Sequence, residues 1–182
     1  MDLKVIRSRR RTIAIRVTRD GVEVRAPLFV SKAKITDFVR RHEGWIEKQK
    51  AKLSAFDEDA RKYPPLDEAD IERLKNEAKR VIPARADYFA KKIGVEYNRI
   101  TVRCQKTRWG SASTKGNLNF NCLLMLTPGE VIDSVVVHEL CHLKHMDHSK
   151  EFYNEVTSVY PEYRKWNGWL RNNGRLILSR IK

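Results

Sequence analysis

The segment His138-Glu139-Leu140-Cys141-His142 is an HExxH motif, and it constrains the fold more than any other part of the chain. Residues four apart lie one turn apart on the same face of an α-helix. His138 and His142 can therefore reach one zinc ion if this segment is helical. Glu139 is then placed to activate a water molecule at the metal. The motif predicts a helix that carries a catalytic zinc site, against the alternative of a core helix with two hydrogen-bonded histidines.

The residues before the motif support a helix. Thr127-Pro128-Gly129-Glu130 matches a capping box, with Thr127 as N-cap, Pro128 in the first turn and Glu130 at the third helical position. The stretch 131–137 is largely apolar. We therefore expect a buried helix that begins at Thr127.

A third metal ligand has to come from beyond His142, and two histidines compete. On a continuing helix His145 would lie about 10 Å along the axis from His138, too far for one zinc ion with bonds of about 2 Å. His148 can return to the metal if the helix ends first, and Met146-Asp147 is a plausible exit. Ser149 can then cap a new helix that carries Phe152. We predict His148 as the third ligand, with Glu151 or Glu155 as the alternative. His145 is then expected either to support a ligand from behind or simply to be exposed.

Composition limits the class of protein. With 182 residues the chain can form one domain, or one domain with a small appendage. No apolar run approaches the length of a membrane helix, and the N-terminus lacks the apolar region of a signal peptide. The three cysteines are odd in number and far apart, which argues for a reducing compartment. We expect a cytoplasmic protein with no membrane partner.

Positive charge is concentrated at the N-terminus. Residues 1–55 hold 15 Lys and Arg against 6 Asp and Glu, whereas the stretch 121–159 around the motif has a net charge of −4. A basic surface favours an anionic partner such as nucleic acid or a nucleotide, although it can also serve only solubility. The cluster Arg7, Arg9, Arg10 and Arg11 is a candidate anion-binding site, because guanidinium groups match phosphate oxygens. An ordinary charged loop is the alternative.

Periodicity predicts an α+β fold in two parts. Alternating apolar residues at 3–7, 12–18 and 22–26, with a turn at Asp20-Gly21, indicate a small antiparallel meander. A helix follows from Ser31 to about residue 54, and 55–66 is the linker candidate. The predicted parts are therefore 1–55, a basic meander with a helix, and 67–182, a hydrolase core.

The second part is expected to hold further elements. A helix capped by Asp67 is expected to be kinked or split at Pro83 and to end at Gly94. Strands are expected at 100–104 and 118–124. The last helix is expected to begin at Pro161 and end at Asn173-Gly174, before a short strand at 176–178.

Several residues are candidates for binding substrate. Arg108 and Trp109 lie in the loop between the two expected strands, where the indole can line a groove or anchor the loop on the core. An electrophilic group should also stabilise the oxyanion of a hydrolytic reaction. The candidates are Tyr153, Tyr160, Tyr163 and Arg164.

With these residues in place, the chain resembles the YgjP-like family of metal-dependent hydrolases nearly end to end. The likeness is carried by Arg9-Arg10-Arg11-Thr12, Asp20-Gly21, Val24-Arg25-Ala26-Pro27, Trp45-Ile46, Arg108-Trp109-Gly110-Ser111, Asn117-Leu118-Asn119, the segment from Val137 to Leu143, and His148-Ser149 with Phe152. The motif alone is similar to that of the WLM and SprT proteases, in which a later histidine also binds zinc. Ala112 stands where the family often has Cys, and Tyr153 where Trp is common.

The resemblance implies a zincin-like metallopeptidase core, with a small antiparallel sheet packed on helices, one of which carries HExxH. We therefore predict a hydrolase with one zinc ion, bound by His138, His142 and His148, in which Glu139 activates the water and the substrate is a peptide. Two alternatives are a metal-dependent nucleotide phosphohydrolase and a nucleic-acid-binding module with structural zinc. The sequence contains no P-loop and no cluster of carboxylates for magnesium, which argues against the phosphohydrolase.

Overall fold

The computed structural model describes residues 3–181, which form two compact units, with the boundary in the sequence between Tyr63 and Pro64. In the part of the chain so described, no helix combines the length and the apolar character that crossing a membrane requires.

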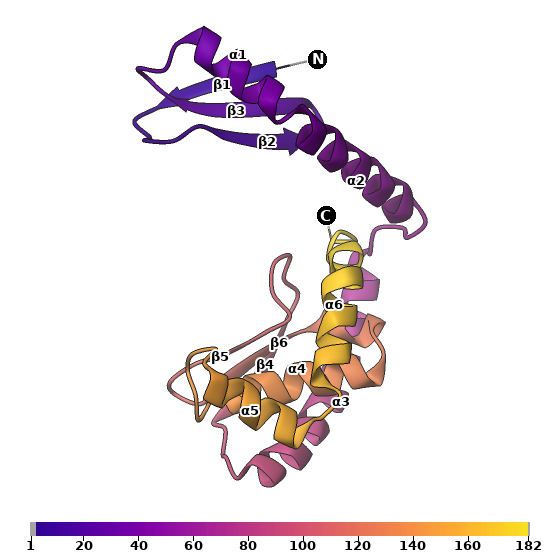
Figure 1. Cartoon of the computed structure of the whole chain (residues 1–182). Coiled ribbons are helices and arrows are strands. Elements are labelled where there is room, and N and C mark those ends of the chain that lie inside the picture. Colours follow the sequence, from indigo (N-terminus) through magenta and orange to yellow (C-terminus); the bar gives the residue numbers. More distant parts are fainter. Residues whose placement is uncertain (1–2, 182) are drawn as a thin grey trace. The chain divides into compact units, whose positions relative to one another are not determined.

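The first unit contains a three-stranded sheet and two helices (Figure 1). Its elements are β1 (Leu3–Ser8), β2 (Ala14–Thr18), β3 (Gly21–Pro27), α1 (Lys32–Arg41) and α2 (Glu43–Arg61). The strand order is β1-β3-β2, with β1 parallel and β2 antiparallel to β3, so the expected antiparallel meander is wrong. The predicted turn is confirmed, with Gly21 at a φ of 128°. Strand β3 takes the centre because Val22, Val24 and Ala26 are its fully buried face.

Two helices replace the single one expected from Ser31 to about residue 54. Ser31 caps α1 as predicted, accepting a hydrogen bond from the Lys34 amide, but the backbone leaves helical geometry at His42. The buried Ile35, Val39 and Ile46 keep helical spacing across this break, so periodicity could not reveal it. Helix α2 then runs to Arg61, through much of the predicted linker.

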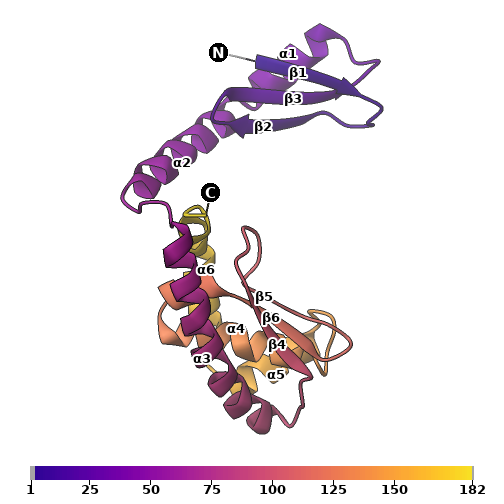
Figure 2. The ribbon, with the colours of Figure 1, turned by 180° about the vertical axis from the view of Figure 1, so that it is seen from behind.

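The second unit contains the HExxH segment (Figures 1 and 2). Its elements are α3 (Glu68–Ile93), β4 (Arg99–Arg103), β5 (Gly110–Ala112), β6 (Asn117–Asn121), the 3-10 helix η1 (Cys122–Leu126), α4 (Gly129–Cys141), α5 (Lys150–Val159) and α6 (Tyr163–Leu178). The sheet order is β4-β6-β5, and only β5 is antiparallel to β6, so the small sheet is mixed instead of antiparallel. The expected second strand ends at Asn121, where η1 begins.

Helix α3 is one continuous helix. Asp67 caps it by accepting from the Asp70 amide, and Gly94 ends it with a φ of 74°, as predicted. Pro83 does not split it. Buried side chains on both sides of the proline, among them Leu74, Ala78, Ile82, Ala86 and Phe89, hold the two halves on one core.

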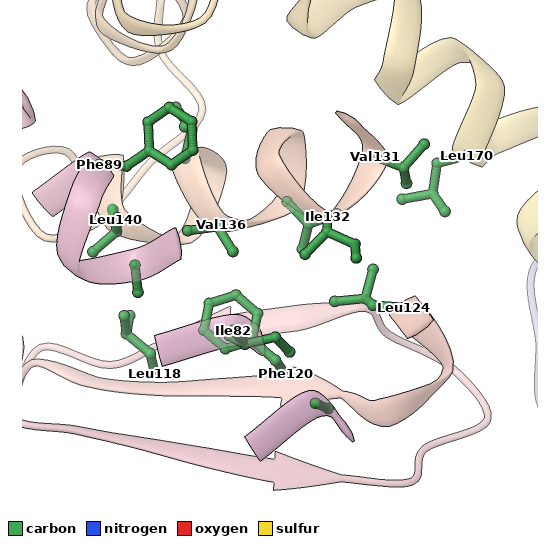
Figure 3. Packing of buried hydrophobic residues seen from close by; sticks show 14 of the residues in the cluster. Ile82, Phe89, Leu118, Phe120, Leu124, Val131, Ile132, Val136, Leu140 and Leu170 are labelled. Atoms are coloured by element: carbon green, nitrogen blue, oxygen red, sulfur yellow. The ribbon is translucent and has the colours of Figure 1, made fainter. Parts of the chain in front are cut away.

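The core of the second unit lies between α3, α4 and the sheet (Figure 3). Ile82 and Phe89 of α3 face Val136 and Leu140 of α4, and β6 contributes Leu118 and Phe120. Helix α4 is therefore buried along most of its length. This burial fixes the helix that carries the motif.

Two helix ends differ from expectation. Helix α4 begins at Gly129, because the Thr127 hydroxyl donates to the Leu124 carbonyl at 2.7 Å and so closes η1 instead of capping α4. Helix α6 continues through Asn173-Gly174 to Leu178, so the expected terminal strand does not form. Gly174 is a packing residue here: a Cβ on it would lie 3.0 Å from the Trp109 ring.

Candidate metal centre

Three histidine side chains converge in the second unit. The Nε2 atom of His138 lies 3.2 Å from the Nε2 atoms of both His142 and His148. Among residues 3–181 these three form the one group of His, Cys, Asp or Glu side chains able to share a metal ion, with ligand atoms within 4.8 Å of one another. Neither His145 nor a glutamate belongs to this group.

His148 reaches the cluster because α4 ends early. The helix stops at Cys141, well before the predicted exit at Met146-Asp147, and His142 is its C-cap. The chain then turns back to Ser149, which caps α5 by accepting from the Phe152 amide. His145 does not lie on a continuation of α4, because the helix has already ended at Cys141. The predicted reason for excluding His145 as a ligand, its distance along that helix, is therefore wrong.

The spacing of the three nitrogens fits a metal ion. Two ligands about 2.0–2.1 Å from a tetrahedral zinc ion lie about 3.3 Å apart, close to the 3.2 Å between the Nε2 atoms. Three neutral imidazoles are also the donor set of a catalytic zinc site, which keeps its fourth position for water. The histidines therefore fit one such ion.

Hydrogen bonds on the far side of two rings orient them toward the metal position. The Nδ1 atom of His142 lies 3.0 Å from the His145 carbonyl, and that of His138 lies 2.8 Å from the Tyr163 hydroxyl. A metal-binding Nε2 requires the proton on Nδ1, so each Nδ1–H donates to its oxygen partner. Tyr163 and the His145 backbone thus fix the tautomers.

Burial keeps His138 and His142 neutral. It lowers the pKa of His138 to about 3, and the neighbouring His142 and His148 lower it further. Burial also lowers the pKa of His142. A neutral imidazole keeps the lone pair that a metal needs.

Glu139 is buried beside His138, with 6% of its surface exposed. This burial raises the pKa of its carboxyl to about 8, although the Ala112 amide donates to the carboxylate and opposes the rise. Strand β5 crosses so closely that a Cβ on Gly110 would lie 2.5 Å from Oε1 of Glu139. Gly110 is a site residue that we did not predict, and its place next to Trp109 in the sequence was the available signal.

A cavity of about 180 Å³ opens beside His138 and Glu139. Its other lining residues are Trp109, Gly110, Ser134, Val135, Tyr163, Asn167 and Leu170. Trp109 lines this cavity and also packs against the core, so it both lines a groove and anchors its loop, the two roles considered for it from the sequence.

The buried Asn121 fixes the loop that carries Trp109. Its side-chain Nδ2 donates to the carbonyls of Gln105 and Arg108 at 2.7 and 2.9 Å, and its backbone amide donates to the Trp109 carbonyl at 2.8 Å. Sequence reasoning missed Asn121, because only the tertiary structure shows which carbonyls it reaches.

Of the other residues predicted to bind substrate or stabilise the oxyanion, some lie near the histidines and others do not. The Tyr153 ring centroid lies 6.1 Å from that of His148, and the side chain is 39% exposed. The Tyr160 hydroxyl instead donates to the Glu130 carbonyl at 3.2 Å. Arg108 and Arg164 are exposed.

The remaining candidates lie elsewhere. Glu155 is paired with Lys144 at 2.8 Å, and Glu151 is exposed. The four candidate arginines belong to the first unit, namely Arg7, Arg9, Arg10 and Arg11.

Comparison with known proteins gives a family match. The family model described as YgjP-like, metallopeptidase domain, matches residues 11–71 and 63–173. A comparison with curated proteins gave no significant match.

Two solved structures are similar at low identity. The metallopeptidase zymogen abylysin of Pyrococcus abyssi is 22% identical, with a TM-score of 0.47, over 52% of this chain and 97% of its own. The metallopeptidase zymogen jannalysin of Methanocaldococcus jannaschii is 19% identical, with a TM-score of 0.45, over 50% of this chain and 95% of its own. Because both scores are below 0.5, the assignment rests on the family model.

Proposed function

The chain belongs to the YgjP-like family, and from that premise we propose how its own residues carry out zinc-dependent peptide hydrolysis. The enzyme is a metal-dependent hydrolase of the metallopeptidase class. We assign His138, His142 and His148 as the ligands of a single zinc ion and Glu139 as the general base. The observation that carries this assignment is the convergence of three Nε2 atoms beside a buried carboxyl group.

A bound zinc ion supplies Lewis acidity, which lowers the pKa of a water molecule to about 7 and polarises the scissile carbonyl. Glu139 takes the proton of the attacking water and then passes it to the leaving amine. The carboxyl group must accept and then release a proton, and its burial, which raises its pKa, favours the protonated form that it passes through. Gly110 and the Ala112 amide hold the carboxylate in place.

We assign the oxyanion-stabilising role to Tyr153. Of the four candidates, Tyr160 donates its hydroxyl proton to the Glu130 carbonyl. The Tyr163 hydroxyl accepts from Nδ1 of His138, on the side of that ring away from the metal position, so we assign it to orienting the ring. Within residues 3–181 the Tyr153 hydroxyl has no hydrogen-bond partner, and its ring lies next to His148. Arg164 is exposed, and among residues 3–181 no hydrogen bond or ion pair joins it to the histidines.

Two features favour a peptide over a nucleotide as substrate. Strand β5 is an edge strand that passes over Glu139, so an extended peptide can pair with its outer edge. The cavity beside Glu139 is lined by Trp109, Val135 and Leu170 and, among the described residues, by no Lys or Arg. Phosphate groups would require such cations.

A structural zinc site is disfavoured because it would be closed by four protein ligands. The cluster offers three within the described residues. The thiols of Cys104, Cys122 and Cys141 are free, which agrees with the predicted cytoplasmic location.

Zinc content and peptide cleavage measured on the same preparations test the site. We expect wild type to bind one zinc ion per chain and cleave a peptide library. Glu139→Gln should keep the zinc and lose about 100- to 10,000-fold in rate, as expected for a lost general base. Tyr153→Phe should keep the zinc and lose about 100-fold in kcat.

The controls are Glu151→Gln and Tyr160→Phe, which change the same residue types away from the histidines and should retain activity. His138→Ala should lose the zinc. A Glu139→Gln variant as active as wild type would refute the assigned base. Release of phosphate or pyrophosphate from nucleotides, without any peptide cleavage, would favour the phosphohydrolase.

A further inference from the structure

One end of the first unit is strongly basic, and the peptidase site does not account for it. The register pairs Ser8 with Pro27 in parallel strands, so the segments that follow β1 and β3 leave the sheet at the same end (Figure 1). Residues 7–13 and 25–36 flank this end and contain seven Arg and Lys but no Asp or Glu. We call the loop residues Arg9–Arg11 and Leu28-Phe29 the basic tip.

An apolar pair stands out within the basic tip. Phe29 is 82% exposed and Leu28 is 60% exposed. The loop that carries them is tied down, because Nη1 of Arg7 donates to the carbonyls of Pro27, Leu28 and Val30 at 3.2, 3.1 and 2.6 Å. Nη1 of Arg7 therefore holds this loop in place. Phe29 is an aromatic ring presented to solvent on a fixed loop.

The arginines of the neighbouring loop are not neutralised. Arg9 and Arg11 are exposed, and neither forms a hydrogen bond or an ion pair with any of the residues 3–181. Arg10 donates to the Thr12 hydroxyl at 3.4 Å, while its Nε is buried without a partner. By contrast, several acidic groups of this unit are paired elsewhere, for example Asp57 with Arg19 and Asp37 with Arg40.

We propose that the basic tip binds single-stranded nucleic acid, with Arg9 and Arg11 on phosphate groups and Phe29 stacked on a base. Guanidinium groups match phosphate oxygens, and their charge accounts for sequence-independent affinity. Stacking of a base on an aromatic side chain contributes about 1–3 kcal/mol and requires an unpaired base. The tied loop lowers the entropy cost of presenting the ring.

An anionic membrane would use the same cations, but the apolar part of the basic tip is too small for it. A single myristoyl chain gives only marginal membrane binding, and Leu28 with Phe29 buries less apolar surface than that chain. The nucleic-acid ligand uses both features of the tip, namely the charge and the flat ring. The proposal does not depend on the peptidase activity of the second unit.

Fluorescence anisotropy with the full chain and a labelled single-stranded oligonucleotide tests this proposal. We expect a Kd of about 1–100 µM that weakens with salt, as is typical of sequence-independent binding. Arg9→Gln/Arg11→Gln should weaken binding at least tenfold and lower the slope of log K against log salt by about 1.4, since single strands give about 0.7 per phosphate. Lys48→Gln/Lys52→Gln removes the same charge from the exposed face of α2 and should have a much smaller effect.

A second substitution separates stacking from simple apolarity. Phe29→Leu keeps an apolar side chain but removes the ring, so it should weaken oligonucleotide binding about tenfold. Phosphatidylcholine vesicles with phosphatidylserine serve as the alternative ligand. The proposal is overturned if the oligonucleotide does not bind, if the arginine and lysine pairs have equal effects, or if the vesicles bind more tightly and tolerate Phe29→Leu.

Discussion

Gly110 lies directly against the Glu139 side chain in the candidate site. The absence of a side chain at Gly110 lets β5 cross the carboxyl group, where a Cβ would lie 2.5 Å from Oε1. The HExxH pattern identifies Glu139 as the proposed base, but it does not say what holds the carboxyl group in position. A glycine in another strand supplies that restraint, together with the Ala112 amide.

Gly110→Ala should therefore impair catalysis without removing the metal. The added methyl group must displace Glu139, and a shift of about 1 Å in a catalytic group can cost about 100-fold in rate. Zinc content and peptide cleavage are the measurements. Gly168→Ala is the matched control, because nothing lies within 4 Å of a Cβ at that position. An unchanged rate for Gly110→Ala would show that Glu139 does not need its observed position.

The buried carboxyl of Glu139 should also make stability depend on pH in the chelator-treated, metal-free protein. Its pKa is raised from an ordinary 4.5 to about 8 by burial, so between these values the folded state holds a proton that the unfolded state releases. Stability from this group is present at low pH and is lost as pH rises through about 8. Glu139→Gln avoids this loss, so its stability relative to wild type should grow from about pH 5 to about pH 8 and then level off. Urea unfolding at each pH measures the difference, and parallel curves for the two proteins would contradict it.

At the scale of elements, the end point of each helix decides which residues it can bring to the site. Helix α4 stops at Cys141 and thereby lets the chain return with His148. Helix α6 does not stop at Asn173-Gly174, so it extends past Trp109. Glycine often ends a helix, but here the contact of Gly174 with the Trp109 ring overrides that tendency. The convergence of the three histidines was therefore predictable from the sequence, whereas the lengths of the helices were not.

Two glycines in the middle of α6 should respond differently to alanine. Gly168→Ala should stabilise the protein by about 0.5–1 kcal/mol, because alanine favours a helix interior and the added methyl group meets nothing. At Gly174 the same gain should be cancelled or reversed, since the methyl group would lie 3.0 Å from the Trp109 ring. The urea midpoints of the two variants measure this contrast. Equal stabilisation would mean that Trp109 moves aside freely.

At the scale of the whole molecule, the chain divides into two units with separate apolar cores. The core of the first unit includes Val24 and Ile46, and that of the second includes Phe120 and Leu140. The histidines, Glu139 and the cavity all belong to the second unit. The proposed nucleic-acid surface belongs to the first.

A fragment of residues 64–182 should therefore fold, bind zinc and cleave peptides at a rate within a few-fold of the full chain. Its core is complete without the first unit, and the ligands come from within it. Circular dichroism, zinc content and peptide cleavage are the measurements, with the fragment's Glu139→Gln variant as control. A fragment that folds but does not bind zinc would show that the first unit completes the site.

The sequence by itself determined two helical features of the site, namely the helix that carries His138 and His142 and the start of the helix that follows His148. HExxH requires a helix with both histidines on one face, and Ser149 before an amphipathic segment starts the helix that returns His148. These are local patterns, because each depends on residues a few positions apart. The family resemblance also followed from such patterns.

Only the tertiary structure decided what surrounds them. Three contacts of the site join residues from different elements: the hydrogen bond between Tyr163 and His138, the close approach of Gly110 to Glu139, and the hydrogen bonds of Asn121 to the loop that carries Trp109. The parallel pairing of β1 with β3 likewise joins segments whose order along the chain suggested a meander. Such contacts depend on how buried faces pack together, and the spacing of residues along the chain does not encode which faces meet.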